Sequence, residues 1–123
     1  MKKIYYNKLV RDLIKEKIEK KGEACSVRAI ADDAEFEQEL FKKVIEEASA
    51  LAHVRSRADF LAEYADLIVV LDALTRKLEI SEADIAVAMT ENVTKKGLFN
   101  NKHYLEWSED TEYKSNETPQ GLK

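Results

Sequence analysis

The pattern of hydrophobic and polar positions predicts a helical chain whose most apolar helix includes residues 60–74. Hydrophobic residues there occupy almost every side of a helical wheel, which is typical of a helix buried all round. Glu63 and Asp66 interrupt the pattern three residues apart, so they share one face. An isolated buried charge is very costly, so we expect both carboxylates to be protonated, paired with a cation or bound to a metal ion. Their neighbours on this face are Ala62, Val69, Val70, Ala73 and Leu74.

Helix-ending residues divide the rest of the chain into three further helices. Gly22 suits the end of the first helix, because glycine readily takes the left-handed conformation found there. Asp32 or Asp33 is the expected N-cap of the second. Ser81 and Asp84 form a capping box for the last, which ends near Gly97. The predicted helices cover about residues 9–21, 33–54, 59–77 and 81–97.

Two segments show weak alternation of polar and apolar residues, near 24–31 and at 103–107. Each is expected to be a short strand or an extended crossing. Residues 1–107 are expected to form one all-α domain, and the polar residues 108–123 a mobile tail. Burying the central helix on every side requires more surface than three other helices provide, so we expect a homo-oligomer.

Composition narrows the class of protein. The chain has 123 residues, of which 36% are charged and 45% hydrophobic, as in a soluble globular domain. Its longest apolar run, residues 67–71, is too short to span a membrane, and no signal peptide is evident. A single cysteine, Cys25, excludes an internal disulfide and favours the reducing cytoplasm. The net charge of −4 gives no general attraction to nucleic acid or acidic membranes.

A second acidic pair, Glu46 and Glu47, lies near the end of the predicted second helix. Together with Glu63 and Asp66 it can supply a group of carboxylate oxygens from two helices. Such groups favour hard cations such as magnesium.

Four stretches occur in an order that resembles one known family. The chain opens with Tyr6-Asn-Lys-Leu-Val-Arg-Asp-Leu-Ile14, similar to a "YNKLVRDKIPEII" start. Glu46-Glu47-Ala-Ser-Ala50 takes the place of an EExxE motif, and Glu63-Tyr-Ala-Asp66 matches ExxD. Lys95-Lys-Gly-Leu-Phe99 is similar to a "KRGGF" segment. On these motifs the chain resembles the MazG-like all-α nucleoside triphosphate pyrophosphohydrolases, which include phosphoribosyl-ATP pyrophosphohydrolase.

The resemblance implies a helical bundle that hydrolyses nucleoside triphosphates to nucleoside monophosphate and pyrophosphate. It implies Mg²⁺, or Mn²⁺ in its place, held by Glu47, Glu63 and Asp66. The homo-oligomer expected from the central helix is a homodimer or homotetramer. Glu46 and Glu47 are the expected catalytic pair, with Glu46 as general base or as a ligand through water. The expected substrate-binding residues are Lys8, Arg11, Asn92, Lys95 and Lys96.

One position departs from the family pattern, because Ala50 stands where EExxE has its third glutamate. The loss of one anionic ligand is expected to weaken magnesium binding and to impair catalysis. Three explanations stay open: an engineered exchange, a natural loss of catalysis, or a rearranged site that uses Glu46. Two other functional hypotheses follow, a non-catalytic relative that binds nucleotide or a protein, and a purely structural helical oligomer.

Each candidate residue also has an ordinary structural explanation. Glu63 and Asp66 can pair with Arg55, Arg57 or Arg11. Glu46 and Glu47 can belong to a solvated helix face. Lys8 and Arg11 can be surface charges or pair between subunits. Lys95 and Lys96 can stabilise the C-terminal end of their own helix through its dipole.

Overall fold

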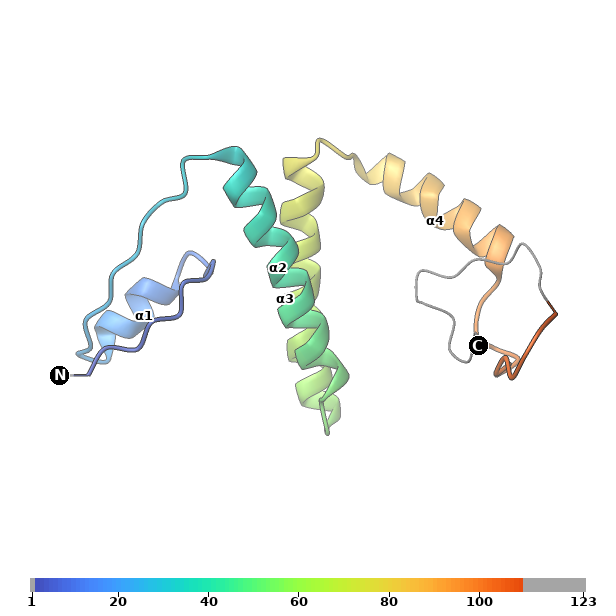
Figure 1. The fold of residues 1–123 in the computed structure, drawn as a ribbon, viewed down its shortest axis with the longest axis horizontal. Helices are drawn as coiled ribbons and strands as arrows, with labels where there is room; N and C mark the ends of the chain where they lie inside the picture. The colour runs from blue at the N-terminus through green and yellow to red at the C-terminus, as the bar shows by residue number, and fades with distance from the viewer. Residues whose placement is uncertain (1, 110–123) are drawn as a thin grey trace. The chain divides into compact units, whose positions relative to one another are not determined.

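The computed structural model describes residues 2–109, and helices are its regular secondary structure (Figure 1). No strand occurs among these residues, so the prediction of an all-α chain is confirmed at the level of fold class. This part of the chain divides into two compact units between Ala86 and Val87, within the last helix. The helices are α1 (Ile14–Lys20), α2 (Asp33–Ala52), α3 (Arg57–Lys77) and α4 (Glu82–Lys96).

Helices α2 and α3 form an antiparallel pair in the first unit, joined by a short turn (Figure 1). Both begin at capped residues. The side chain of Asp32 accepts a hydrogen bond from the Glu35 amide at 3.3 Å, and that of Ser56 accepts one from the Asp59 amide at 3.0 Å. The predicted cap at Asp32 is confirmed, and α3 begins two residues earlier than expected. The hydroxyl of Ser56 caps the first turn of α3, so the helix includes Arg57 and Ala58.

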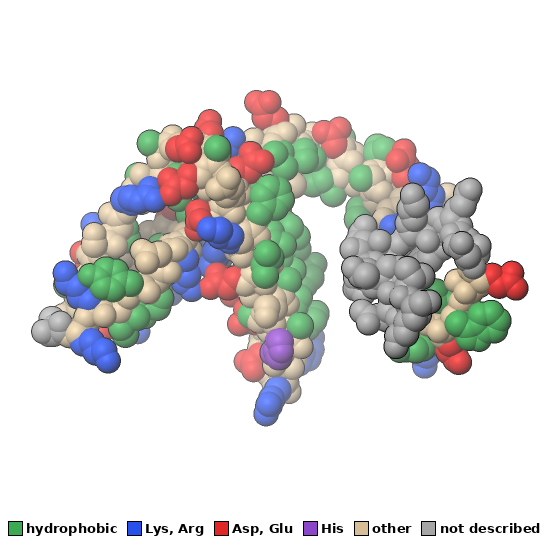
Figure 2. Space-filling model, viewed as in Figure 1, with side chains coloured by type: hydrophobic (Ala, Val, Ile, Leu, Met, Phe, Trp, Pro, Cys, Tyr) green, Lys and Arg blue, Asp and Glu red, His purple; other side chains and the backbone are tan. Residues whose placement is uncertain are grey.

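The core of the first unit lies between these two helices. Leu40, Val70 and Leu74 are buried, and Leu9, Phe36, Val44 and Ala73 pack against them. Helix α3 therefore buries one face against α2. Its opposite face stays apolar and exposed, with Leu61 at 51% and Tyr64 at 49%. Figure 2 shows hydrophobic side chains in a row along the helix pair.

The first helix is shorter than predicted. Residues 9–11 are not helical, and α1 begins at Ile14 after a turn. The reason is tertiary, because Leu9 packs against the core while Lys8 and Arg11 form ion pairs with α2 and α3. The predicted C-terminal glycine is confirmed. Gly22 has φ +80°, and the amides of Gly22 and Glu23 donate to the carbonyls of Glu19 and Ile18.

The expected capping box of α4 is also present. The Ser81 amide donates to Asp84 Oδ2 at 3.0 Å, and the Asp84 amide donates to Ser81 Oγ at 3.1 Å. The helix ends at Lys96, before Gly97 with φ +74°.

The two segments with weak alternation form no strands. Residues 23–31 cross irregularly from α1 to α2, and residues 103–107 have no regular structure (Figure 1). A short strand needs a neighbour to satisfy its amides and carbonyls, and this part of the chain offers none. Most of the predicted tail, from residue 110 onward, lies outside the described residues. Among residues 2–109, no helix is both long enough and apolar enough to cross a membrane.

Candidate functional site

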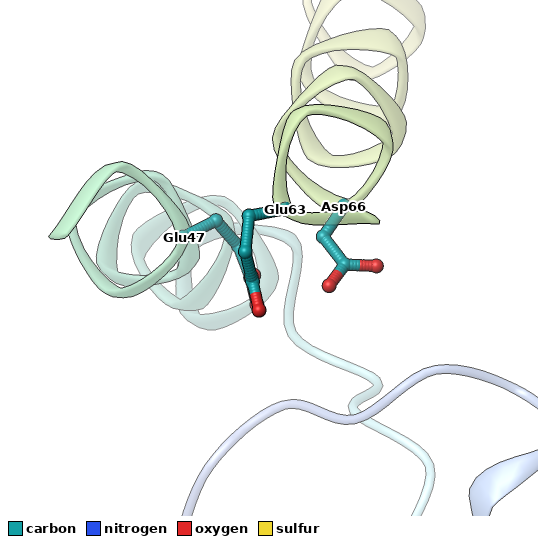
Figure 3. Close-up of side chains that lie close together, drawn as sticks. All are labelled: Glu47, Glu63 and Asp66. Atoms are coloured by element: carbon teal, nitrogen blue, oxygen red, sulfur yellow. The ribbon is translucent and has the colours of Figure 1, made fainter. Parts of the chain in front are cut away.

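Three carboxylates from two helices meet in the first unit, and we call Glu47, Glu63 and Asp66 the acidic cluster. One oxygen from each lies within 4.8 Å of those from the other two. Glu47 comes from α2, and Glu63 and Asp66 come from α3. All three side chains are half-buried and point to the side of the helix pair along which the N-terminal segment passes (Figure 3). The structure thus brings together the three predicted metal ligands.

Helix periodicity explains why the cluster forms. On α2, Leu40, Val44 and Glu47 follow one another at helical spacing, so Glu47 continues the stripe that packs on α3. On α3, Glu63 and Asp66 occupy the face that carries Val70 one turn later. The antiparallel pairing places these two stripes against each other. The carboxylates therefore lie where the apolar contact between the helices ends.

Basic side chains surround the acidic cluster. Lys8 Nζ lies 2.6 Å from Glu46 Oε1, and Arg11 Nη1 lies 3.4 Å from Asp66 Oδ1. Lys43 pairs with Glu46 and, at 3.4 Å, with Glu47. Figure 2 shows acidic and basic side chains intermingled where the N-terminal segment meets α2. No cationic partner of Glu63 is found within residues 2–109.

The charges near the cluster shift several pKa values. Partial burial raises the pKa of Glu63, and the negative charges of Asp66 and Glu47 raise it further. The pKa of Glu46 is lowered by its hydrogen bonds to Lys43 and Lys8. Burial opposes the charge on Lys43, but its bond to Glu46 and the nearby carboxylates outweigh burial and raise its pKa. The surroundings thus disfavour the ionised form of Glu63 and favour that of Glu46.

A cavity of about 730 Å³ lies between the N-terminal segment and the helix pair. Glu47 and Asp66 form part of its lining, as do four basic residues. The lining thus combines negative and positive groups, which suits a ligand that carries both a divalent cation and phosphate groups. The basic lining residues are Lys8, Arg11, Lys17 and Lys43.

The acidic cluster fits a hard divalent cation. All its donors are carboxylate oxygens, the ligands that Mg²⁺ and Mn²⁺ prefer. Two oxygens bound to one Mg²⁺ lie at most about 4.2 Å apart, which is twice the usual ligand distance. The oxygens of the cluster lie within 4.8 Å of one another, so small side-chain rotations bring them into range.

The other predicted site residues lie in different surroundings. Lys8 and Arg11 reach the cluster region through ion pairs, whereas Glu46 pairs with Lys8 and Lys43 and is not part of the acidic cluster. Of the arginines considered as partners of the α3 carboxylates, Arg11 pairs with Asp66. Asn92, Lys95 and Lys96 lie on α4 within the second unit, and their role toward a substrate stays a prediction.

Sequence reasoning missed Lys17 and Lys43. For Lys43 a signal was present, because a lysine four residues before Glu47 lies on the same helix face. Lys17 had no such signal, since its approach to the cavity depends on where α1 lies in the first unit.

Ala50 is half-buried on α2, three residues after Glu47 and on the same face. A carboxylate at this position would begin about one helical turn from Glu47.

No family model, curated protein or solved structure matches the chain.

Proposed function

We propose that this chain is a pyrophosphohydrolase of the MazG-like class that acts on nucleoside triphosphates with Mg²⁺ or Mn²⁺. The products are nucleoside monophosphate and pyrophosphate. The observation that carries the proposal is the acidic cluster, in which Glu47 of α2 meets Glu63 and Asp66 of α3 within 4.8 Å. The family resemblance assigned metal binding to the same three residues from the sequence alone. The single cysteine favours action in a reducing cytoplasm.

In this proposal the side chains divide the work between cation and phosphate. Glu47, Glu63 and Asp66 hold the cation, which when bound neutralises phosphate charge and polarises the phosphorus–oxygen bonds. Lys8 and Arg11 bind the phosphate oxygens, and Arg11 is suited to a two-point contact because its guanidinium is planar. By the family resemblance, Asn92, Lys95 and Lys96 of α4 are further candidates for phosphate binding. Glu46 takes the proton of the attacking water, and its lowered pKa keeps it ionised for that role.

A second candidate is a non-catalytic relative that binds nucleotide or a protein partner. Ala50 favours it, because the cluster lacks the family's third glutamate. The ion pairs of Glu46 with Lys8 and Lys43 also favour it, since a carboxylate held by two cations is a weak base.

Pyrophosphate release decides between these candidates. The parent chain and Ala50→Glu are each incubated with Mg²⁺ and a panel of ribo- and deoxyribonucleoside triphosphates. We expect Ala50→Glu to release pyrophosphate at least about tenfold faster than the parent, because a fourth carboxylate strengthens cation binding. Glu63→Gln in the Ala50→Glu background is the matched control and should abolish the gain.

The other outcomes are equally informative. If the parent is already as active as Ala50→Glu, Glu46 or water replaces the missing ligand and the ligand set must be revised. If neither chain turns over any nucleotide, the enzyme proposal is wrong. Equilibrium binding of a non-hydrolysable triphosphate then tests the second candidate.

We also propose that the chain assembles as a homodimer or homotetramer. The support is the apolar face of α3 that α2 leaves exposed, which includes Phe60, Leu61, Tyr64 and Leu71 at 38–51% exposure. A second copy of the chain presents the same face, so two copies can bury these side chains against each other.

A further inference from the structure

We infer that Arg11 competes with a divalent cation for Asp66, so that cation binding transfers Arg11 from Asp66 to a phosphate in the same cavity. This inference rests on the proposed function, because it concerns how the cation and the phosphate come to be bound together. It assigns Arg11 a second role, as the residue through which cation binding promotes phosphate binding.

The competition follows from the ion pair itself. Arg11 Nη1 lies 3.4 Å from Asp66 Oδ1, and Asp66 is one of the three residues of the acidic cluster. A cation held by Asp66 and the guanidinium of Arg11 are both attracted to the same negative charge, so each weakens the binding of the other.

The ion pair is weak enough to be displaced. The side chain of Arg11 is 54% exposed and that of Asp66 is 44% exposed. Ion pairs between exposed side chains contribute little, because water screens them. A divalent cation shared by three carboxylates has the stronger attraction, so Arg11 is the group that gives way.

Displaced Arg11 stays in the cavity because its chain segment is anchored on both sides. Leu9 packs against the core of Leu40, Val70 and Leu74, and the Arg11 carbonyl accepts a hydrogen bond from the Ile14 amide at 3.1 Å. The freed guanidinium therefore remains beside Lys8, Lys17 and Lys43, the other basic groups of the 730 Å³ cavity. A phosphate in this cavity can then accept two hydrogen bonds from the guanidinium of Arg11, which is otherwise engaged by Asp66.

Isothermal titration with Mn²⁺ and the full-length chain tests the competition without measuring activity. Arg11→Gln is expected to bind Mn²⁺ about two- to fivefold tighter than the parent. This range corresponds to the free energy that an exposed ion pair contributes. Arg11→Lys keeps the charge and should stay near the parent value. Lys17→Gln is the matched control. It removes the same charge from the same cavity, but Lys17 has no ion pair within residues 2–109.

A second titration tests the transfer to phosphate. With saturating Mg²⁺, a non-hydrolysable deoxynucleoside triphosphate analogue should bind Arg11→Gln at least about tenfold more weakly than the parent. We expect Arg11→Gln to bind Mn²⁺ more tightly and the triphosphate more weakly than the parent. Loss of a residue that merely stabilises the fold would weaken the binding of both.

Three outcomes overturn the inference. If Lys17→Gln strengthens Mn²⁺ binding as much as Arg11→Gln does, the effect comes from the loss of any positive charge in the cavity and not from the contact with Asp66. If Arg11→Gln leaves Mn²⁺ binding unchanged or weakens it, there is no competition, although a parent that binds Mn²⁺ leaves the proposed function standing. If neither the parent nor Ala50→Glu binds Mn²⁺, the proposed function fails and the inference fails with it.

Discussion

The raised pKa of Glu63 has a consequence for stability. Partial burial and the charges of Asp66 and Glu47 raise its pKa above the ordinary value of 4.5. A carboxyl group with a raised pKa in the folded state stabilises the fold while it is protonated, below the unfolded value. That contribution is lost as the pH rises through the folded value. At neutral pH without divalent cations, ionised Glu63 therefore opposes folding.

We expect Glu63→Gln to unfold at a higher temperature than the parent at pH 7 in buffer with chelator. The difference should shrink as the pH falls toward 4.5, where the parent carboxyl becomes protonated. Thermal unfolding followed by circular dichroism from pH 4 to pH 8 measures this. Glu19→Gln, an exposed change on α1, is the control and should leave the midpoint unchanged.

Adding Mg²⁺ should reverse the order, because only the parent keeps all three carboxylates and gains stability from the bound ion. A Glu63→Gln variant that is less stable than the parent at pH 7 in chelator would show that the carboxylate makes a favourable contact in the fold.

At the scale of single residues, the sequence predicted part of the candidate site. The spacing of Glu63 and Asp66 placed them on one helix face. Which residues of α2 and α3 lie opposite each other depends on how the two helices pair, and sequence spacing does not fix that. The pairing of Arg11 with Asp66 was one of three alternatives that the sequence offered, and sequence spacing could not choose among the arginines. The pairing of Lys8 with Glu46 was not predicted, because it depends on where the N-terminal segment crosses α2.

Several helix ends were predictable because their caps are formed by nearby residues. Caps at Asp32, Ser81 and Gly22 are local features, since a side chain or a glycine conformation satisfies groups within a few residues. The first turn of the predicted N-terminal helix was wrong because Leu9 is drawn to the core, a contact between distant parts of the chain. Weak alternation in residues 23–31 could not indicate that a partner strand was missing.

The end of α3 repeats the geometry of the end of α1 with an unfavourable residue. Glu79 has φ +57°, and the Glu79 and Ile80 amides donate to the carbonyls of Arg76 and Thr75 at 3.2 and 2.8 Å. In α1 the corresponding residue is Gly22. A side chain at this left-handed position costs about 1 kcal/mol, whereas glycine adopts it freely.

We therefore expect Glu79→Gly to raise the free energy of unfolding by about 0.5 kcal/mol, after allowing for the greater freedom of glycine in the unfolded chain. Urea unfolding measures the change as a higher midpoint with an unchanged slope. Glu79→Ala is the matched control, because it removes the charge but keeps the Cβ atom, and it should give no such gain. If Glu79→Gly and Glu79→Ala have equal effects, the change comes from the lost charge, and the argument from backbone strain is wrong.

At the scale of the whole molecule, the exposed apolar far face of α3 is the surface from which we expect self-association. Leu61, Ala65 and Ile68 lie along it at helical spacing, and Phe60 stacks with Tyr64 with their ring centroids 6.0 Å apart. Asp72 lies farther along the same face and is exposed. Burying that carboxylate without a partner would be costly, so a self-association surface should end before it. The proposed contact therefore centres on the first three turns of α3.

Sedimentation velocity at about 50 µM tests this assignment, a concentration at which a stable interface of ordinary size stays occupied. We expect the parent to sediment as a dimer or tetramer. Leu61→Glu should shift it toward monomer and raise the dissociation constant of the oligomer at least about tenfold. The reason is that the substitution places an unpaired charge in an apolar contact. Val27→Glu is the control, since Val27 is similarly exposed, at 50% against 51%, but lies outside α3. A monomeric parent, or a Leu61→Glu variant that assembles as the parent does, would exclude this face as the interface.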